Sequence, residues 1–369
     1  MNSVGNQAVD RKFRQPTPTP GAWNGLIIHT DTPFPRKSTT SKKWNKFKDG
    51  LRWIVDSVLE GHNYVDTGSL RGVAGLSVNI TEVYSNGHCF LKGFSNTIEA
   101  WRGDRDIDGW RLSEAMSAVA MMEGEDAPTM EFKKGYPVKT RITSQLVDHA
   151  NALLRLFSSD LPLMVPLRPT DAHKLQYTVG DASAEGFSIV TQYPDLTIQA
   201  RDGLWDEVFA EGGSNLRDVQ NFGNHLLEEI RAGMHDGCAL WAATDNAVWS
   251  AVWHKGMSSV KHLFKIAVDL RVECQSHEVF LHLFHISGDR MIATGIDERS
   301  RGNLDAGVSL GHDIHPFIPL NKGAFELAGP LLEGWCRSWM GADFSQPLEP
   351  VEWFWEGHLS GHLLQWQRW

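Results

Sequence analysis

Residues 175–200, LQYTVGDASAEGFSIVTQYPDLTIQA, decide the fold of the second half of this chain. The stretch holds three short apolar runs, at 175–180, 186–191 and 196–200, each of a length typical of a β-strand. Gly, Ser, Asp and Pro fall between the runs, and these residues favour turns. The pattern therefore predicts three consecutive strands, of which the first two form a hairpin.

Helical and extended patterns alternate after these strands. The sequence predicts a helix, a strand, two helices and a strand, at 215–232, 239–244, 246–254, 258–275 and 278–287. Strands joined through a helix usually run parallel, whereas strands joined by a tight turn run antiparallel. We therefore expect a mixed five-stranded sheet with flanking helices.

The first half of the chain has a different periodicity. Apolar residues recur every three or four residues, which is typical of amphipathic helices, at 42–60, 69–83, 88–101, 112–122 and 142–157. We expect this half to be mainly helical. The whole chain then belongs to the α+β or α/β class, with a helical N-terminal region followed by the mixed sheet.

Changes in composition divide the chain into four segments. Residues 1–21 end in alternating Pro and Thr, which cannot continue a helix and indicate a flexible segment. Residues 22–165 carry the helical pattern, and residues 172–305 carry the strands. Residues 306–369 form an extension rich in Pro, Gly and Trp, with one expected helix at 322–339.

Composition excludes several classes of protein. With 41% hydrophobic and 22% charged residues, the 369-residue chain does not resemble a disordered protein. No run approaches the roughly 18 apolar residues of a membrane-spanning helix. The N-terminus lacks the apolar stretch of a signal peptide, and the four scattered cysteines indicate neither a disulfide framework nor a zinc site. We expect an intracellular protein, cytoplasmic or nuclear and not secreted.

Charge is distributed unevenly along the chain. The net charge of −10 argues against indiscriminate binding to nucleic acid. Residues 1–60, however, hold ten Lys and Arg against five Asp and Glu, an excess of five positive charges. Such a segment could attract a phosphate backbone or form the solvated face of a helix, and the sequence leaves both readings open.

Four aspartates lie in or beside the predicted elements: Asp181, Asp218, Asp245 and Asp297. Asp181 and Asp245 follow apolar runs, as expected of carboxylates at strand ends. Carboxylates brought together repel one another unless divalent cations lie between them, and two such ions suit phosphodiester hydrolysis. Simpler roles stay open: a turn residue for Asp181, a helix N-cap for Asp297 and a partner of the helix dipole for Asp218.

Several stretches resemble a known family. Asp245-Asn246, Trp253-His254-Lys255-Gly256 and residues 284–302, FHISGDRMIATGIDERSRG, are similar to the ribonuclease H end of retroelement polymerases. The resemblance is to DIRS-like retrotransposons, which encode a tyrosine recombinase. The stretches that look like the segment after the reverse transcriptase palm of these elements are 20–25, 28–31, 91–94 and 106–110. The resemblance covers residues 20–355, and 285–302 is its most specific part.

The resemblance implies a fold and an activity. It implies a region like the thumb and connection of a reverse transcriptase, followed by a ribonuclease H domain. That domain would be a hydrolase that cuts RNA within an RNA–DNA hybrid, as an endonuclease. No Tyr-x-Asp-Asp motif occurs, so the palm is missing and no polymerase activity is expected. The expected partners are an RNA–DNA hybrid or another nucleic acid and a polymerase palm encoded upstream, but no membrane.

The resemblance also implies the site residues. Asp181 would bridge two Mg²⁺ or Mn²⁺ ions, and the other three aspartates, Asp218, Asp245 and Asp297, would complete their coordination. The residues expected to contact nucleic acid are Ser183, Asn246, Lys255, Arg299 and Arg301.

One departure from the family keeps a second reading open. The family has Glu where this chain has Asp218, which is one methylene shorter, and metal–ligand distances tolerate little error. Glu228 or Glu229 could substitute, although each lies ten or more residues further along the chain. The alternative is therefore a catalytically inactive ribonuclease H-fold protein that binds nucleic acid or acts as a scaffold, from a degenerate or domesticated element. An unstable pseudogene product is a further alternative.

Overall fold

The computed structural model describes most of the chain up to residue 308. The described residues are 21–23, 26–29, 35–106, 108–113, 131–133, 135–166, 174–193, 195, 197–205, 213–256, 258 and 260–308. They form two compact units. Unit 1 comprises the described residues of Met1–His173 and Val252–Glu278, and unit 2 those of Lys174–Ala251 and Val279–Trp369.

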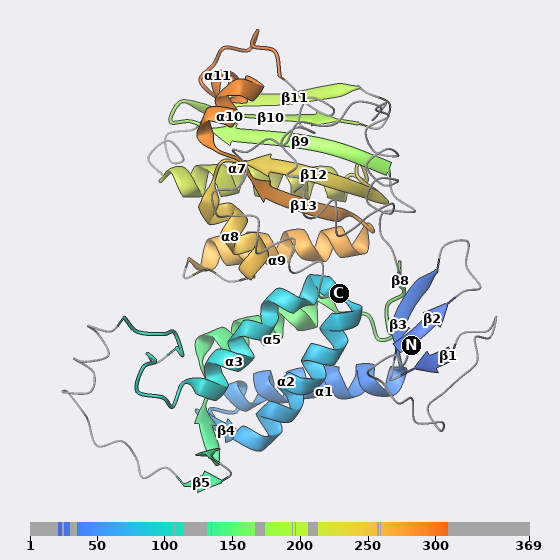
Figure 1. Cartoon of the computed structure of the whole chain (residues 1–369), viewed down its shortest axis with the longest axis vertical. Coiled ribbons are helices and arrows are strands. Elements are labelled where there is room, and N and C mark those ends of the chain that lie inside the picture. The colour runs from blue at the N-terminus through green and yellow to red at the C-terminus, as the bar shows by residue number, and fades with distance from the viewer. Residues whose placement is uncertain are drawn as a thin grey trace, which may run out of the picture. The chain divides into compact units, whose positions relative to one another are not determined.

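Unit 2 is built on the mixed five-stranded sheet that the sequence predicts. Its strands are β9 (Lys174–Ala182), β10 (Gly186–Gln192), β11 (Ile198–Leu204), β12 (Cys238–Thr244) and β13 (Phe280–His285). Their order across the sheet is β11-β10-β9-β12-β13 (Figure 1). The pairs β9–β10 and β10–β11 are antiparallel, and β9–β12 and β12–β13 are parallel. The predicted fold class is confirmed.

The two faces of this sheet carry different helices. Helix α7 (Ser214–Arg231) packs on the face of Gly180, where an added Cβ atom would collide with the ring of Phe222. Neighbouring side chains on a strand point to opposite faces, so Val179 points away from α7. Val179 packs instead with residues of α10 (Gly288–Thr294) and α11 (Ile296–Ser300). These two helices are too short to give a periodic pattern, and the sequence does not predict them.

Unit 1 is mainly helical, as expected. Its helices are α1 (Ser41–Leu59), α2 (Thr67–Val83), the 3₁₀ helix η2 (Ser85–Leu91), α3 (Lys92–Glu99), α5 (Ser144–Leu156) and α9 (Lys261–Ser276). Aromatic side chains fill the core, and the fully buried Trp44 meets Tyr84 and Phe157 with ring centroids 5.5 Å apart in each pair. The helix predicted at 88–101 is in fact η2 followed by α3. Most of the helix predicted at 112–122, and all of that at 322–339, lies outside the described residues.

Short strands in unit 1 were not predicted. An antiparallel sheet has the order β1-β2-β3-β8, with β1 (Gly21–Trp23), β2 (Leu26–His29), β3 (Arg36–Thr39) and β8 (Val165–Pro166). Two further pairs are β4 (Tyr64–Asp66) with β7 (Lys139–Arg141), and β5 (Phe132–Lys133) with β6 (Tyr136–Pro137). Strands of two to four residues are too short to show alternation, so their pairing is visible only in three dimensions.

Helix α9 belongs to unit 1, although its sequence lies between β12 and β13 of unit 2. Its Val268 is part of the helical core, and its Asp269 accepts from Arg155 of α5 at 2.5 Å. Helix α8 (Ala247–Lys255) comes between β12 and α9 in the sequence. In the parts of the chain that the structure describes, no helix combines the length and apolar character needed to cross a bilayer.

Candidate active site

Two of the four predicted aspartates meet at one end of the sheet of unit 2. Asp181 is the penultimate residue of β9, and Asp245 directly follows β12. The two strands are parallel, with Ala243 paired to Val179, so Asp245 stands level with Asp181. Side chains two residues apart share a face, and both carboxylates therefore lie on the face covered by α10 and α11. Asp181 is only 7% exposed.

Helix α11 brings the third aspartate, Asp297, to the same face. The Ser300 hydroxyl lies 2.7 Å from Oδ2 of Asp181 and 2.9 Å from the backbone carbonyl of Asp297, and it has one hydrogen to donate. Both oxygens of Asp297 accept from Arg301, at 2.8 and 3.0 Å. Helix α11 therefore carries Asp297 on its own backbone and contacts Asp181 through the Ser300 hydroxyl.

Asn246 holds the fourth aspartate, Asp218, which lies in the second turn of α7. The Asn246 amide nitrogen donates to Oδ2 of Asp218 at 2.7 Å and to Oδ1 of Asn215 at 3.0 Å. The amide oxygen accepts from the backbone N–H of Trp249 at 2.8 Å, which caps the start of α8. One side chain thus ties the end of β12 to α7.

The four carboxylates form one electrostatic cluster. Burial raises the pKa of Asp181, and the charges of Asp245 and Asp297 raise it further, against the Ser300 hydrogen bond. Burial raises the pKa of Asp218 to about 7, against the Asn246 hydrogen bond, and Asp181 and Asp245 add to the rise. Burial also raises the pKa of Asp245, an effect that His285 opposes and Asp297 reinforces. Ionising the whole cluster is therefore costly without a compensating positive charge.

His285 closes one side of this cluster. It is the last residue of β13, and its Nε2 lies 2.9 Å from the backbone carbonyl oxygen of Asp245. The ring is half-buried. This contact fixes the orientation of the imidazole beside the carboxylate.

The residues predicted to contact nucleic acid have different surroundings. Ser183 accepts from the backbone N–H groups of Glu185 and Gly186 at 3.1 Å, and it donates to the carbonyl of Ser300 at 2.8 Å. Arg299 pairs with Asp202 at 2.6 Å and bonds the carbonyl of Ala306. These two side chains therefore have structural partners within unit 2.

The other three predicted contacts are distributed differently. Arg301 keeps 60% of its side chain exposed while it binds Asp297. Lys255 is exposed at the end of α8 and belongs to unit 1. Asn246 is buried as the bridge between β12, α7 and α8.

No three His, Cys, Asp or Glu side chains stand close enough to hold a metal ion, among the residues that the structure describes. Three of the carboxylates are instead satisfied by donors from the protein, Ser300, Asn246 and Arg301. Backbone N–H groups donate to the cluster as well: that of Ala182 to Asp181 and Asp218, and that of Asp245 to its own carboxylate. Oxygen donors of this kind suit Mg²⁺ and Mn²⁺.

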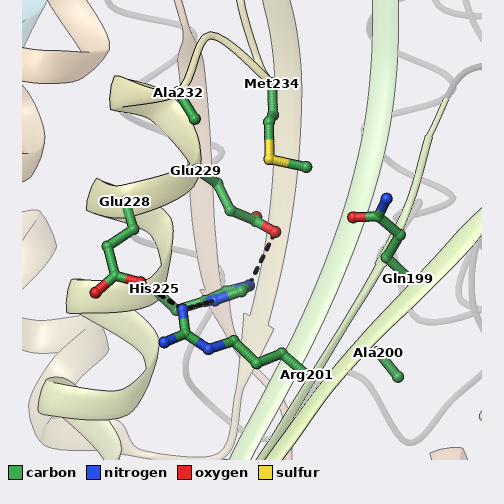
Figure 2. Close-up of a pocket in the computed structure, with 8 residues that line it drawn as sticks. All are labelled: Gln199, Ala200, Arg201, His225, Glu228, Glu229, Ala232 and Met234. Atoms are coloured by element: carbon green, nitrogen blue, oxygen red, sulfur yellow. Dashed lines mark hydrogen bonds and ion pairs between the residues drawn. The ribbon is translucent and has the colours of Figure 1, made fainter.

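A second group of charged residues gathers at the other end of α7 (Figure 2). Here Glu229 accepts from His225 at 3.1 Å and from His235 at 2.8 Å, and burial, which alone would raise its pKa, is outweighed so that the pKa falls to about 2. The cavity beside it measures about 330 Å³ and is lined by Arg201, Glu228 and Met234 among others.

This second group is separate from the aspartates. Glu229 lies eleven positions after Asp218 along the helix, roughly 16 Å at 1.5 Å per residue. None of the four aspartates lines the cavity, and Glu228 pairs with Arg201 at 2.5 Å. Neither Glu228 nor Glu229 is therefore in a position to replace Asp218. No sequence pattern marks this group, because its histidines come from a helix and from the loop after it.

Comparison with known proteins adds a likeness of fold. No protein-family model matches the chain, and no curated protein does. Similar solved structures include ribonuclease H1 from the halophilic archaeon Halobacterium salinarum, at 12% identity and a TM-score of 0.27, over 36% of this chain and 96% of that one. LC11 ribonuclease H1, solved in complex with an RNA/DNA hybrid, matches at 14% identity and a TM-score of 0.27 over the same shares.

A viral reverse transcriptase is also similar. The foamy viral protease–reverse transcriptase dRH in complex with double-stranded DNA matches at 8% identity and a TM-score of 0.24, over 72% of this chain and 38% of that one. At these identities and TM-scores the likeness says nothing about activity, which has to be argued from the aspartates. The strand order and pairing of unit 2 are themselves those of a ribonuclease H-like fold.

Proposed function

We propose that unit 2 is a ribonuclease H-type endonuclease that hydrolyses the RNA strand of an RNA–DNA hybrid with two Mg²⁺ or Mn²⁺ ions. One observation carries the proposal: four segments distant in sequence bring the buried Asp181 and the half-buried Asp218, Asp245 and Asp297 into one group of mutually repelling carboxylates. A cluster that destabilises its own charge, with only partial compensation, is suited to bind divalent cations.

The chain's own residues would divide the work as follows. Asp181 interacts with all three other aspartates, so it would hold the ions together with each of them. Ser300 orients Asp181, Asn246 orients Asp218, and Arg301 holds Asp297. The bound ions would supply an activated water and stabilise the leaving oxygen.

The substrate class rests on the resemblance of residues 284–302 to the ribonuclease H end of retroelement polymerases of the DIRS-like kind. A hybrid duplex is recognised through its backbone and 2′-hydroxyl groups, and this recognition is independent of sequence. The exposed part of Arg301, beside Asp297, is the side chain of this cluster best suited to approach a phosphate. The free cysteines Cys89, Cys238 and Cys274 favour an intracellular location for this activity.

A gel assay on a hybrid with a labelled RNA strand tests the proposal. We expect cleavage with Mg²⁺ or Mn²⁺, none in EDTA, and none of the same RNA as a single strand. The Asp245→Asn variant, with a matching melting temperature, should be inactive and so exclude a contaminating nuclease. Cleavage that persists in EDTA, or that is specific to Zn²⁺, would contradict the two-metal mechanism.

One observation favours a second candidate, an inactive ribonuclease H-like protein that binds nucleic acid. Both oxygens of Asp297 are engaged by Arg301, and Asp218, with a pKa of about 7, is held by Asn246. These contacts compete with cations for the same oxygens. Titration calorimetry with Mg²⁺ separates the candidates. The enzyme should bind the ion, either in the absence of nucleic acid or with a hybrid present. The inactive protein should bind no Mg²⁺, and its affinity for a hybrid should be the same in EDTA.

A further inference from the structure

Unit 1 contains a cavity that the proposed hydrolysis does not use. It measures about 470 Å³ and is lined by Arg71, Ile98, Glu99, Trp101, Arg102 and Tyr136, among others. Three separate segments build it: the first turns of α2, the end of α3 with the residues after it, and strand β6. Its volume lies within the roughly 300–1,000 Å³ typical of small-ligand sites.

Aromatic rings form part of the wall. The Arg71 guanidinium lies 4.3 Å from the centroid of the Tyr136 ring, a cation–π contact. The Trp101 ring meets Phe132 edge-on, with centroids 5.4 Å apart, and Phe132 is 52% exposed. Gly135, with a φ of +83°, makes the turn between β5 and β6 that carries Phe132 and Tyr136 to this place. The cavity therefore offers flat surfaces to an aromatic ring.

Among the described residues, the charged side chains that line the cavity are two arginines and one glutamate. Glu99 is its acidic lining residue, and it is paired to Arg105 at 2.7 Å and more loosely to Arg102 at 3.8 Å. Within the described residues, no carboxylate pairs with Arg71. Arg71 and Arg102 against Glu99 thus leave the described lining with an excess of one positive charge beside the aromatic wall.

We propose that this cavity binds one unpaired nucleotide of a single-stranded nucleic acid. The base would stack against Trp101 and Tyr136, and the adjoining phosphates would meet Arg71 and Arg102. Stacking on rings with charge at the rim is tolerant of sequence, because every base has a flat face. RNA and DNA share this chemistry. The site uses no metal ion, so it goes beyond the proposed hydrolysis and does not depend on it.

Fluorescence anisotropy of the full chain in EDTA tests the site. The probes are a short labelled oligodeoxyadenylate, its RNA counterpart, and the same DNA backbone with abasic sites in place of bases. We expect the base-bearing strands to bind roughly tenfold more tightly than the abasic strand, as the loss of one stacked base implies. The tighter of the two base-bearing strands identifies the natural source.

Variants locate the binding. Arg71→Ala and Trp101→Ala should each weaken binding roughly tenfold. Arg52→Ala is the matched control, because Arg52 is an exposed arginine of unit 1 that does not line the cavity, and its loss should have little effect. Trp101→Phe keeps a ring against Phe132 and should restore most of the binding, which separates stacking from a folding defect.

Three results would overturn the proposal. Equal weakening by Arg52→Ala and Arg71→Ala would show diffuse attraction by charge, equal affinity for the abasic strand would show that no base is held, and equal competition by polyglutamate would indicate a site for acidic peptides. The measurement in EDTA excludes metal-dependent cleavage. Failure here leaves the proposed hydrolysis untouched, and an inactive aspartate cluster leaves this site untouched.

Discussion

The two ends of helix α7 place acidic side chains in opposite situations. Near its start, the half-buried Asp218 lies near Asp181 and Asp245, and burial together with their charges raises its pKa to about 7. Near its end, Glu229 is buried between two histidines, and its pKa falls to about 2. Burial penalises both carboxylates, so the partners decide the outcome. The acid between two histidines stabilises the fold, whereas the cluster of like charges is a candidate for binding cations.

The largest effect is expected when one charge is removed from the aspartate cluster. Asp245→Asn keeps the shape of the side chain but deletes a proposed metal ligand, so cleavage of the hybrid should fall by at least about a hundredfold. The readout is the initial rate at saturating Mg²⁺, compared at equal melting temperature. Asp195→Asn is the control, since Asp195 is an exposed loop residue bonded to Thr197, and its rate should not change. An undiminished rate in Asp245→Asn would remove Asp245 from the site.

A change at the other end of α7, where Glu229 binds two histidines, should alter the stability of the fold. Glu229→Gln leaves His225 and His235 without their shared carboxylate, which should lower the free energy of unfolding by roughly 3 kcal/mol. Urea denaturation measures this, and Glu228→Gln is the control. Glu228 is 61% exposed in its pair with Arg201, so its replacement should cost less than about 1 kcal/mol. Equal costs for the two variants would mean that the histidine contacts contribute nothing.

A third test uses pH in EDTA. Folded Asp218 keeps its proton up to about pH 7, whereas the unfolded chain releases it near the ordinary value of 3.8. Between these values the native state binds more protons, so raising the pH lowers its stability. Asp218→Asn removes this loss. Its melting temperature should exceed that of the unmodified protein, by an amount that grows from pH 4 to pH 7 and then levels off. A difference that shrinks with rising pH would show that Asp218 is stabilised as an anion.

The smallest effect is expected from Asp218→Glu. The longer side chain would restore the residue found in the resembled family and extend the carboxylate past the Asn246 amide. Cleavage should rise a few-fold, and the Mg²⁺ concentration for half-maximal rate should fall. A loss of activity would instead indicate a site repacked around the shorter Asp. Full activity in Asp218→Ala would place the fourth ligand elsewhere.

The sheet of unit 2 was predictable because each of its strands is long enough to show its pattern. Residues 175–180 and 239–244 became β9 and β12 with ends shifted by only one or two residues. Their parallel pairing follows from the helix between them, and it brings Asp181 level with Asp245. The positions of these two strand ends could thus be predicted from the local sequence pattern and from the rule that a helix usually joins parallel strands.

What the sequence could not show depends on contacts between distant segments. Ser300 lies 119 residues from Asp181, and nothing in its own surroundings marks it as the donor to that carboxylate. Asn246 was expected to face nucleic acid, yet its amide is committed to Asp218 and the start of α8. The environment of Glu229 likewise depends on His235, which lies beyond the end of the helix. Such hydrogen bonds depend on how distant segments pack together, and they produce no periodic pattern in the sequence.

The path of the chain through α9 has a consequence for how the protein can be divided. Unit 1 needs residues 252–278, whose Val268 fills its core and whose Asp269 is bound by Arg155, and these residues are reached only after β12 of unit 2. A stop codon or a recombination breakpoint at residue 174 would therefore strip unit 1 of a helix and expose an apolar surface. Neither unit can be inherited, lost or exchanged as a single uninterrupted segment of gene.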